Sequence, residues 1–172
     1  MRFILETKRL VIRETNAQDA DAIFALHTNR EVQKYTGDTI PNTIKEVKEG
    51  LQRHAEENFI KRGFGRWAVI YKPNNKLIGW SGLKYLPEFD EIDLGYRFFP
   101  EYWGMGIATE TAIPIVSYGF EHLKLHRIIG IAMQENLASI NVLKKAGMTL
   151  DQIAPYDESG VDVEWYSVEN IS

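Results

Sequence analysis

The stretch from Glu91 to Met133 constrains the fold most, because it reads as strand, glycine-containing turn, long helix and strand in succession. Residues 91–99 and 127–133 carry the apolar runs of strands, and residues 107–122 have helical spacing. A helix between two strands is the usual connection between parallel neighbours. We therefore predict a strand–helix–strand crossover in the C-terminal half of the chain.

The remaining segments add an antiparallel meander and a group of helices before that crossover. A turn at Pro73-Asn74-Asn75 joins two apolar runs into a hairpin. The expected strands are Phe3–Glu14, Arg66–Tyr71, Lys76–Tyr85 and Val163–Val168, and the expected helices are 18–27, 32–35, 41–59 and 139–146. This order predicts an α+β fold with a mixed, mostly antiparallel central sheet flanked by helices.

Composition narrows the class of protein. A length of 172 residues fits a single domain spanning residues 1–172, and the absence of cysteine excludes disulfides, thiolate nucleophiles and cysteine–zinc sites. No signal peptide or membrane-spanning run is visible, so we expect a cytoplasmic protein with no membrane partner. The net charge of −4 and the lack of a Lys/Arg cluster argue against a nucleic-acid partner. No metal-ligand motif is found, and no metal is expected.

The turn before the long helix carries the strongest chemical signal. It reads Trp103-Gly104-Met105-Gly106-Ile107, so two glycines directly precede a helix. Backbone N–H groups and the positive end of a helix can hold a pyrophosphate there without a basic side chain. The alternative is a pair of ordinary turn glycines. Neither a Walker A loop nor a complete dinucleotide fingerprint is present, since Thr109 occupies the place of the third glycine.

A second segment about 30 residues further on completes a recognisable set. Together the motifs resemble the GNAT superfamily of N-acetyltransferases, and within it the RimJ/RimL-type branch. The matching segments are 7–13, 100–110, 125–128, Asn136 with Ser139, and 145–148. The resemblance implies transfer of an acetyl group from acetyl-CoA, as co-substrate, to a primary amine of a protein N-terminus or a small molecule. It also implies that strands 91–99 and 127–133 splay apart to form the cofactor cleft, and it leaves a homodimer open.

The resemblance also assigns cofactor contacts. The backbone N–H groups that would hold the pyrophosphate belong to Trp103, Gly104, Met105, Gly106, Ile107, Ala108 and Thr109. Backbone groups of Tyr96 and Phe98 would pair with the pantetheine arm as an added strand. Asn136 would hydrogen-bond that arm, with a helix cap or turn residue as the alternative. Asn141 would reach the cofactor, with a solvated helix position as the alternative.

Two catalytic residues follow from the same resemblance. Asp93 stands where many members have a glutamate and would act as the base, directly or through a water; the alternative is a solvated strand residue. The usual general-acid tyrosine is replaced by Leu143, so Ser139 becomes the expected proton donor, with a helix cap as its alternative. Because that tyrosine is missing, a non-catalytic acetyl-CoA-binding module is the alternative function. The loop departs from the family once more at Glu101, where glutamine or arginine is usual.

Overall fold

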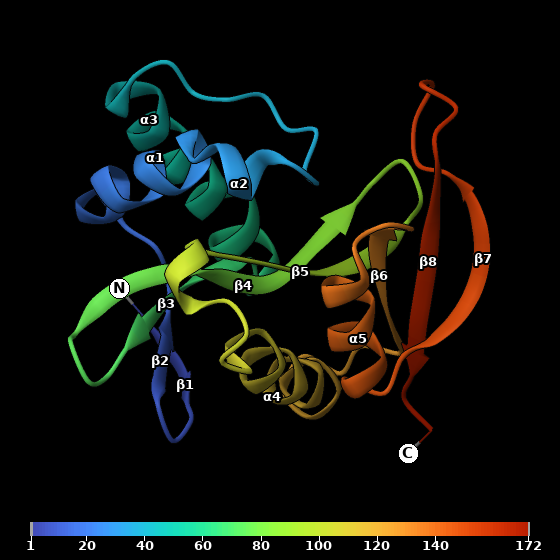
Figure 1. Cartoon of the computed structure of the whole chain (residues 1–172). Helices are drawn as coiled ribbons and strands as arrows, with labels where there is room; N and C mark the ends of the chain where they lie inside the picture. Colours follow the sequence, from blue (N-terminus) through green and yellow to red (C-terminus); the bar gives the residue numbers. More distant parts are fainter. Residues whose placement is uncertain (1, 172) are drawn as a thin grey trace. The chain divides into compact units, whose positions relative to one another are not determined.

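The computed structural model describes residues 2–171 and contains a mixed, mostly antiparallel sheet flanked by helices (Figure 1). The predicted fold class is therefore confirmed. The strand order is β1-β2-β3-β4-β5-β6-β8-β7, in which β5 and β6 pair in parallel. The strands are β1 (Phe3–Glu6), β2 (Leu10–Arg13), β3 (Arg66–Tyr71), β4 (Lys76–Leu86), β5 (Glu91–Phe98), β6 (Arg127–Met133), β7 (Thr149–Pro155) and β8 (Asp162–Glu169).

Within residues 2–171, five α-helices and three helical segments of other types accompany the strands. The α-helices are α1 (Ala20–Thr28), α2 (Arg30–Gln33), α3 (Ile44–His54), α4 (Ile107–Glu121) and α5 (Leu137–Lys145). These segments are the 3-10 helices η1 (Ala17–Asp19) and η3 (Pro100–Tyr102) and the π-helix η2 (Ala55–Ile60). No helix formed by residues 2–171 combines the length and apolar character needed to cross a membrane.

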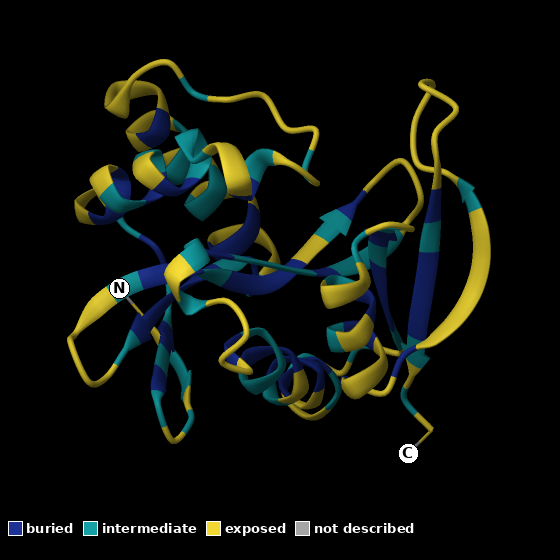
Figure 2. Ribbon diagram, viewed as in Figure 1, coloured by how far each residue is buried: buried dark blue, intermediate teal, exposed yellow. Residues whose placement is uncertain are grey.

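The chain divides into two compact units. The first holds the residues up to Gly82 together with Tyr96–Ile107, and the second holds Leu83–Gly95 and the residues from Ala108 onward. Each unit has its own buried cluster, and Figure 2 shows buried residues concentrated along the strands and on single faces of the helices. Ala20, Ile23 and Val47 are buried together in the first cluster, and Leu86, Ile129, Val163 and Trp165 in the second.

Local signals explain how the helices of the first unit begin. Asn16 and Asp19 form a reciprocal capping box before α1, and Arg13 pairs with Asp19 at 2.8 Å. Thr43 caps α3 by accepting a hydrogen bond from the backbone N–H of Glu46 at 3.2 Å. The helix expected to open at Pro41 therefore begins at Ile44, and its last part becomes the π-helical η2.

The sequence-based element order missed two features. The single strand expected over Phe3–Glu14 is an antiparallel pair, β1 and β2, connected by a turn at residues 7–9. Strand β7 was missed because nearly all of its residues are exposed, so it shows no alternation of apolar and polar side chains. It nevertheless pairs with β8 along its length. The helix predicted over 139–146 begins earlier, at Leu137.

Candidate active site

The glycine turn before α4 has the backbone geometry that only glycine adopts easily. Gly104 has φ of +70° and Gly106 has φ of +76°, both in the left-handed region. A Cβ at Gly104 would meet nothing within 4 Å, so its glycine is required by the backbone and not by lack of space. Ile107 is buried and anchors the start of α4, whereas residues 103–106 are exposed. The turn thus presents its backbone to solvent at a helix N-terminus.

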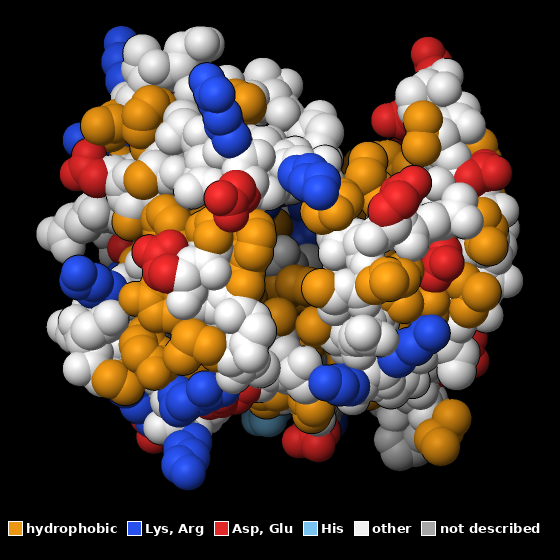
Figure 3. Space-filling view, in the orientation of Figure 1, with side chains coloured by type: hydrophobic (Ala, Val, Ile, Leu, Met, Phe, Trp, Pro, Cys, Tyr) orange, Lys and Arg blue, Asp and Glu red, His pale blue; other side chains and the backbone are white. Residues whose placement is uncertain are grey.

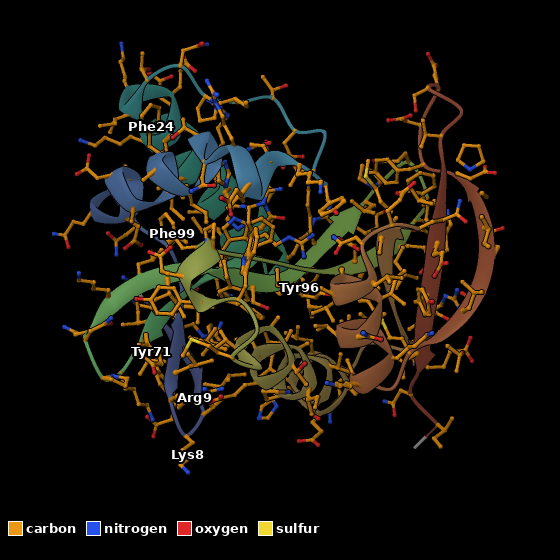
Figure 4. All side chains as sticks on the ribbon, viewed as in Figure 1. Lys8, Arg9, Phe24, Tyr71, Tyr96 and Phe99 are labelled. Atoms are coloured by element: carbon orange, nitrogen blue, oxygen red, sulfur yellow. The ribbon has the colours of Figure 1, made fainter. Side chains whose placement is uncertain are left out.

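Side chains from the first unit hold this turn in place. The indole Nε1 of Trp103 donates to the carbonyl of Phe98 at 2.9 Å. Arg9 Nη2 donates to the carbonyl of Met105 at 2.9 Å, from the turn between β1 and β2, where Figure 4 labels Arg9 beside Lys8. Just before the turn, the hydroxyl of Tyr102 accepts a hydrogen bond from Asn74 Nδ2 at 3.0 Å. The turn and the residue before it are therefore held by one local contact, from Trp103 to Phe98, and by two contacts from positions distant in sequence.

The backbone at the end of β5, just before this turn, is hydrogen-bonded to β4 along one edge. Phe99 N–H donates to the carbonyl of Ile78 in β4 at 3.0 Å. Because backbone groups alternate in direction along a strand, those of Phe98 and Tyr96 point toward the opposite edge of β5. The Phe98 carbonyl accepts from the Trp103 indole, so that group is already engaged.

The predicted catalytic residues and the two asparagines belong to the second unit. Asp93 is half-buried in β5 and lies in register with Ile129 of β6. Asn136 is the N-cap of α5, and its Oδ1 accepts from the N–H of Ser139 at 3.2 Å. The capping alternative therefore holds for Asn136, and it is wrong for Ser139, which lies inside the first turn. Asn141 is exposed on α5, as its solvated alternative requires.

Leu143 is a core residue in this structure. It is 1% exposed, and an ideal Cβ built on Gly130 of β6 would lie only 2.4 Å from Leu143 Cδ2. The leucine thus packs against a glycine of the neighbouring strand. This arrangement explains why the residue is apolar, and it provides no group that could donate a proton.

Glu91, two residues before Asp93, takes part in an ion-pair network. Its Oε1 accepts from Arg127 Nε at 3.0 Å, and Arg127 also contacts Asp151 at 2.5 Å and Glu169 at 3.2 Å. The negative charge of the Glu91 carboxylate is therefore partly balanced by the guanidinium of Arg127. Among residues 2–171, no group of three or more His, Asp or Glu side chains is placed to hold a metal ion.

Sequence reasoning missed a polar cluster in the first unit that surrounds Trp80. Arg97 of β5 pairs with Asp38, and its Cζ lies 5.1 Å from the centre of the Trp80 ring. Trp80 Nε1 donates to His27 Nε2 at 3.3 Å, which makes the ring nitrogen an acceptor. Burial, and then the charge of Arg97, lower the pKa of His27 from 6.5 to about 4, although Asp38 opposes the shift. His27 is therefore neutral at pH 7.

Basic, acidic and apolar side chains are interspersed on the face of the molecule in Figure 3. Tyr96 and Phe99 are labelled in Figure 4 on the segment that leads from β5 into the glycine turn. Tyr96, the end of β5 and the glycine turn up to Ile107 all belong to the first unit, whereas the earlier part of β5 and the rest of α4 belong to the second.

Comparison with known proteins is consistent with this geometry. Residues 9–149 match the family model described as "Acetyltransferase (GNAT) domain". The uncharacterized N-acetyltransferase YoaA of Bacillus subtilis is 38% identical over 145 residues, which cover 84% of this chain and 81% of that protein.

Solved structures show the same fold. A GNAT-family acetyltransferase from Bacillus anthracis superposes with a TM-score of 0.80 and 28% identity over 98% of both chains. Spermidine N-acetyltransferase from Vibrio cholerae, solved with CoA and spermine, gives a TM-score of 0.77 at 21% identity over 95% of this chain and 96% of that one. The last likeness concerns the fold alone. Because the family model spans most of the sequence, the chain belongs to the GNAT family of N-acetyltransferases and is an acyltransferase enzyme.

Proposed function

We propose that this enzyme transfers the acetyl group of acetyl-CoA to a primary amine. The observation that carries the proposal is the turn at Gly104 and Gly106, where two left-handed glycines open α4 with exposed backbone. N–H groups at a helix start favour a phosphate, and CoA carries a pyrophosphate. The spermidine N-acetyltransferase of similar fold was solved with CoA and with spermine, an amine.

The cofactor contacts are assigned on this basis. The N–H groups from Gly104 to Thr109 hold the pyrophosphate, and the backbone of Tyr96 and Phe98 orients the pantetheine arm. The N–H expected from Trp103 is left out, because it already donates to the carbonyl of Pro100 at 3.0 Å. The carbonyl of Phe98 already accepts a hydrogen bond from Trp103, so the N–H of Phe98 is the group that we assign to the pantetheine arm. Asn136 and Asn141 remain proposed contacts as well, and the capping bond of Asn136 uses only its Oδ1.

The chemical step is attack of a neutral amine on the thioester carbonyl, which forms the amide and releases the thiolate. Asp93 removes a proton from the ammonium, directly or through a water. Ser139 protonates or steadies the departing sulfur, and the N-terminus of α5 also favours negative charge there. Leu143 is excluded from this role by its chemistry. The proposed acceptor is the N-terminal amine of a protein or a small amine. We assign the enzyme to the RimJ/RimL-type branch and treat residues 1–172 as a single acetyltransferase domain.

A charged substitution in the glycine turn tests the cofactor assignment. Gly106→Glu places a carboxylate where the pyrophosphate is assigned, so calorimetry should show CoA affinity reduced tenfold or more. Gly160→Glu is the matched control, since Gly160 has φ of +73° and nothing within 4 Å of its Cβ. It adds the same charge and comparable backbone strain in the exposed turn before β8. Equal CoA affinity in both variants would reject the assignment.

Turnover is tested separately from binding. Consumption of acetyl-CoA is followed with a panel of peptides, polyamines and small amines. A protein that binds CoA but consumes no thioester with any amine would contradict the proposed acceptor class.

A further inference from the structure

Arg97 is a buried guanidinium whose hydrogen-bonding capacity is only partly used. Its side chain is 9% exposed, and Nη2 donates to Oδ2 of Asp38. Nη1 is fully buried and makes no hydrogen bond to any of the described residues. Buried N–H donors are almost always paired in folded proteins, because an unpaired donor loses its hydration without replacement. The Arg97 fork therefore has one donor nitrogen, Nη1, that is available to a second acceptor atom.

Asp38 is an exchangeable partner for this fork. Its side chain is 53% exposed, and the surrounding residues 37–40 are exposed as well. The ion pair uses one carboxylate oxygen and one guanidinium nitrogen. An incoming carboxylate could instead bind both Nη1 and Nη2, the bidentate geometry in which arginine–carboxylate pairs are strongest.

The surroundings of Arg97 favour an anion over a cation. Arg66 also lies over Trp80, with its Cζ 5.2 Å from the ring centre, and His27 carries no charge at neutral pH. An ammonium bound at Asp38 would stand beside the Arg97 guanidinium and be repelled by it.

We propose that Arg97 binds a carboxylate of the amine acceptor, which takes the place of the Asp38 side chain. This inference rests on the proposed function, because Arg97 lies between Tyr96 and Phe98, the residues assigned to the pantetheine arm. Arg97 lies within β5, the strand assigned to the pantetheine arm, whereas the phosphates of CoA are assigned to the region of the glycine turn; we therefore assign the anion at Arg97 to the acceptor. The acceptor class is an amino acid or a peptide with an acidic side chain near its N-terminus.

Pairs of amines that differ only in the carboxylate test this inference. Lysine is compared with cadaverine, phenylalanine with phenethylamine, and the peptide amide Ala-Asp with Ala-Asn. In at least one pair, the wild-type enzyme should show a kcat/KM at least tenfold higher for the carboxylate-bearing amine than for its partner. The amino-acid pairs and the peptide pair distinguish the two sources of the carboxylate.

Variants of the ion pair sharpen the test. Arg97→Lys keeps the charge and removes the fork, so the preference for the carboxylate should fall about tenfold with CoA affinity unchanged. Asp38→Asn removes the competing carboxylate, so KM for the carboxylate-bearing amine should fall severalfold while KM for its partner stays constant. Asp21→Asn, at an exposed position of α1, is the control for the loss of one negative charge.

Three results would overturn the inference. The first is equal kcat/KM within every pair, and the second is a loss for all amines in Asp38→Asn, which would assign the ammonium to Asp38. The third comes from calorimetry with CoA present, if the carboxylate-bearing amines bind wild type and Arg97→Lys equally. Because this binding measurement needs no turnover, it still decides the inference if no acetyl transfer is seen, which would count against the proposed function alone.

Discussion

The hydrogen bond from Arg9 to the Met105 carbonyl should contribute measurably to CoA affinity. Arg9 reaches the turn from a position 96 residues earlier in the chain, and its Nη2 would lie 3.9 Å from a Cβ on Gly106. The family's usual glutamine or arginine in the loop is Glu101 here. Arg9 therefore supplies a cationic contact to a loop that carries an acidic residue, Glu101, where the family usually has glutamine or arginine. Arg9→Met removes the guanidinium and keeps an apolar stem.

The size of the effect follows from the kind of contact. Hydrogen bonds to charged groups contribute about 1.5–3 kcal/mol, and exposure to solvent reduces such a contribution to about 1 kcal/mol. In Arg9→Met the turn is no longer held by this hydrogen bond, so CoA must order the turn as it binds. The free energy of the lost hydrogen bond is then subtracted from the free energy of CoA binding. A loss of about 1 kcal/mol corresponds to roughly a fivefold weaker Kd for CoA.

The matched control is Lys8→Met, because Lys8 is the exposed neighbour and carries the same charge. Titration calorimetry with CoA at about 0.15 M salt limits the long-range effect of either charge. Arg9→Met should weaken CoA binding severalfold more than Lys8→Met, and Arg9→Lys should fall between them. Equal Kd values for Arg9→Met and Lys8→Met would refute the role of the Met105 contact.

Three further outcomes are expected. Ser139→Ala should slow single-turnover acetyl transfer roughly ten- to a hundredfold, about 1.4–2.7 kcal/mol of barrier, with little change in melting temperature; Asn136→Ala should instead cost about 1 kcal/mol of stability, because Asn136 is the cap. Asp93→Asn should lower turnover far more than acetyl-CoA affinity, with partial recovery at high pH, and normal rates at neutral pH would move the base elsewhere. The pKa of His27 is about 4 in the folded state and near 6.5 in the unfolded state. Between these pH values the unfolded state therefore binds more protons. The free energy of unfolding should fall as the pH drops from 6.5 toward 4, by at most about 3 kcal/mol. Urea unfolding should show a smaller loss in His27→Gln, and an equal loss would exclude His27 as the cause.

The parts of the fold that could be predicted are those with a local signal. Apolar runs identified β3, β4, β5 and β6, and the spacing of apolar residues identified α4 to within one residue. The glycine turn could be recognised because a left-handed backbone restricts the residue type, and both glycines have positive φ. In contrast, β7 has exposed side chains along nearly its whole length and carries no periodic pattern.

The contacts that could not be predicted connect distant positions. Arg9 donates to the backbone carbonyl of Met105, and because every residue type has such a carbonyl, the sequence does not reveal this contact. Arg97 and Asp38 are 59 residues apart, and the helix-rich segment between Asp38 and β3 gives no register that would bring them together. Only the tertiary arrangement reveals that a buried arginine and an exposed aspartate form one pair.

The replacement of a tyrosine by Leu143 has a structural consequence that bears on catalysis. Leu143 fills the space above Gly130, where a Cβ would lie 2.4 Å from its Cδ2, so leucine and glycine fit each other as a pair. Leu143 is 1% exposed, so the larger ring of a tyrosine at this position would need more space than the leucine methyls now fill. Restoring the tyrosine alone would therefore overpack the core before it supplied a proton. This packing agrees with our proposal that Ser139, in the first turn of α5, provides the hydroxyl for the departing thiolate, where the helix N-terminus also favours negative charge.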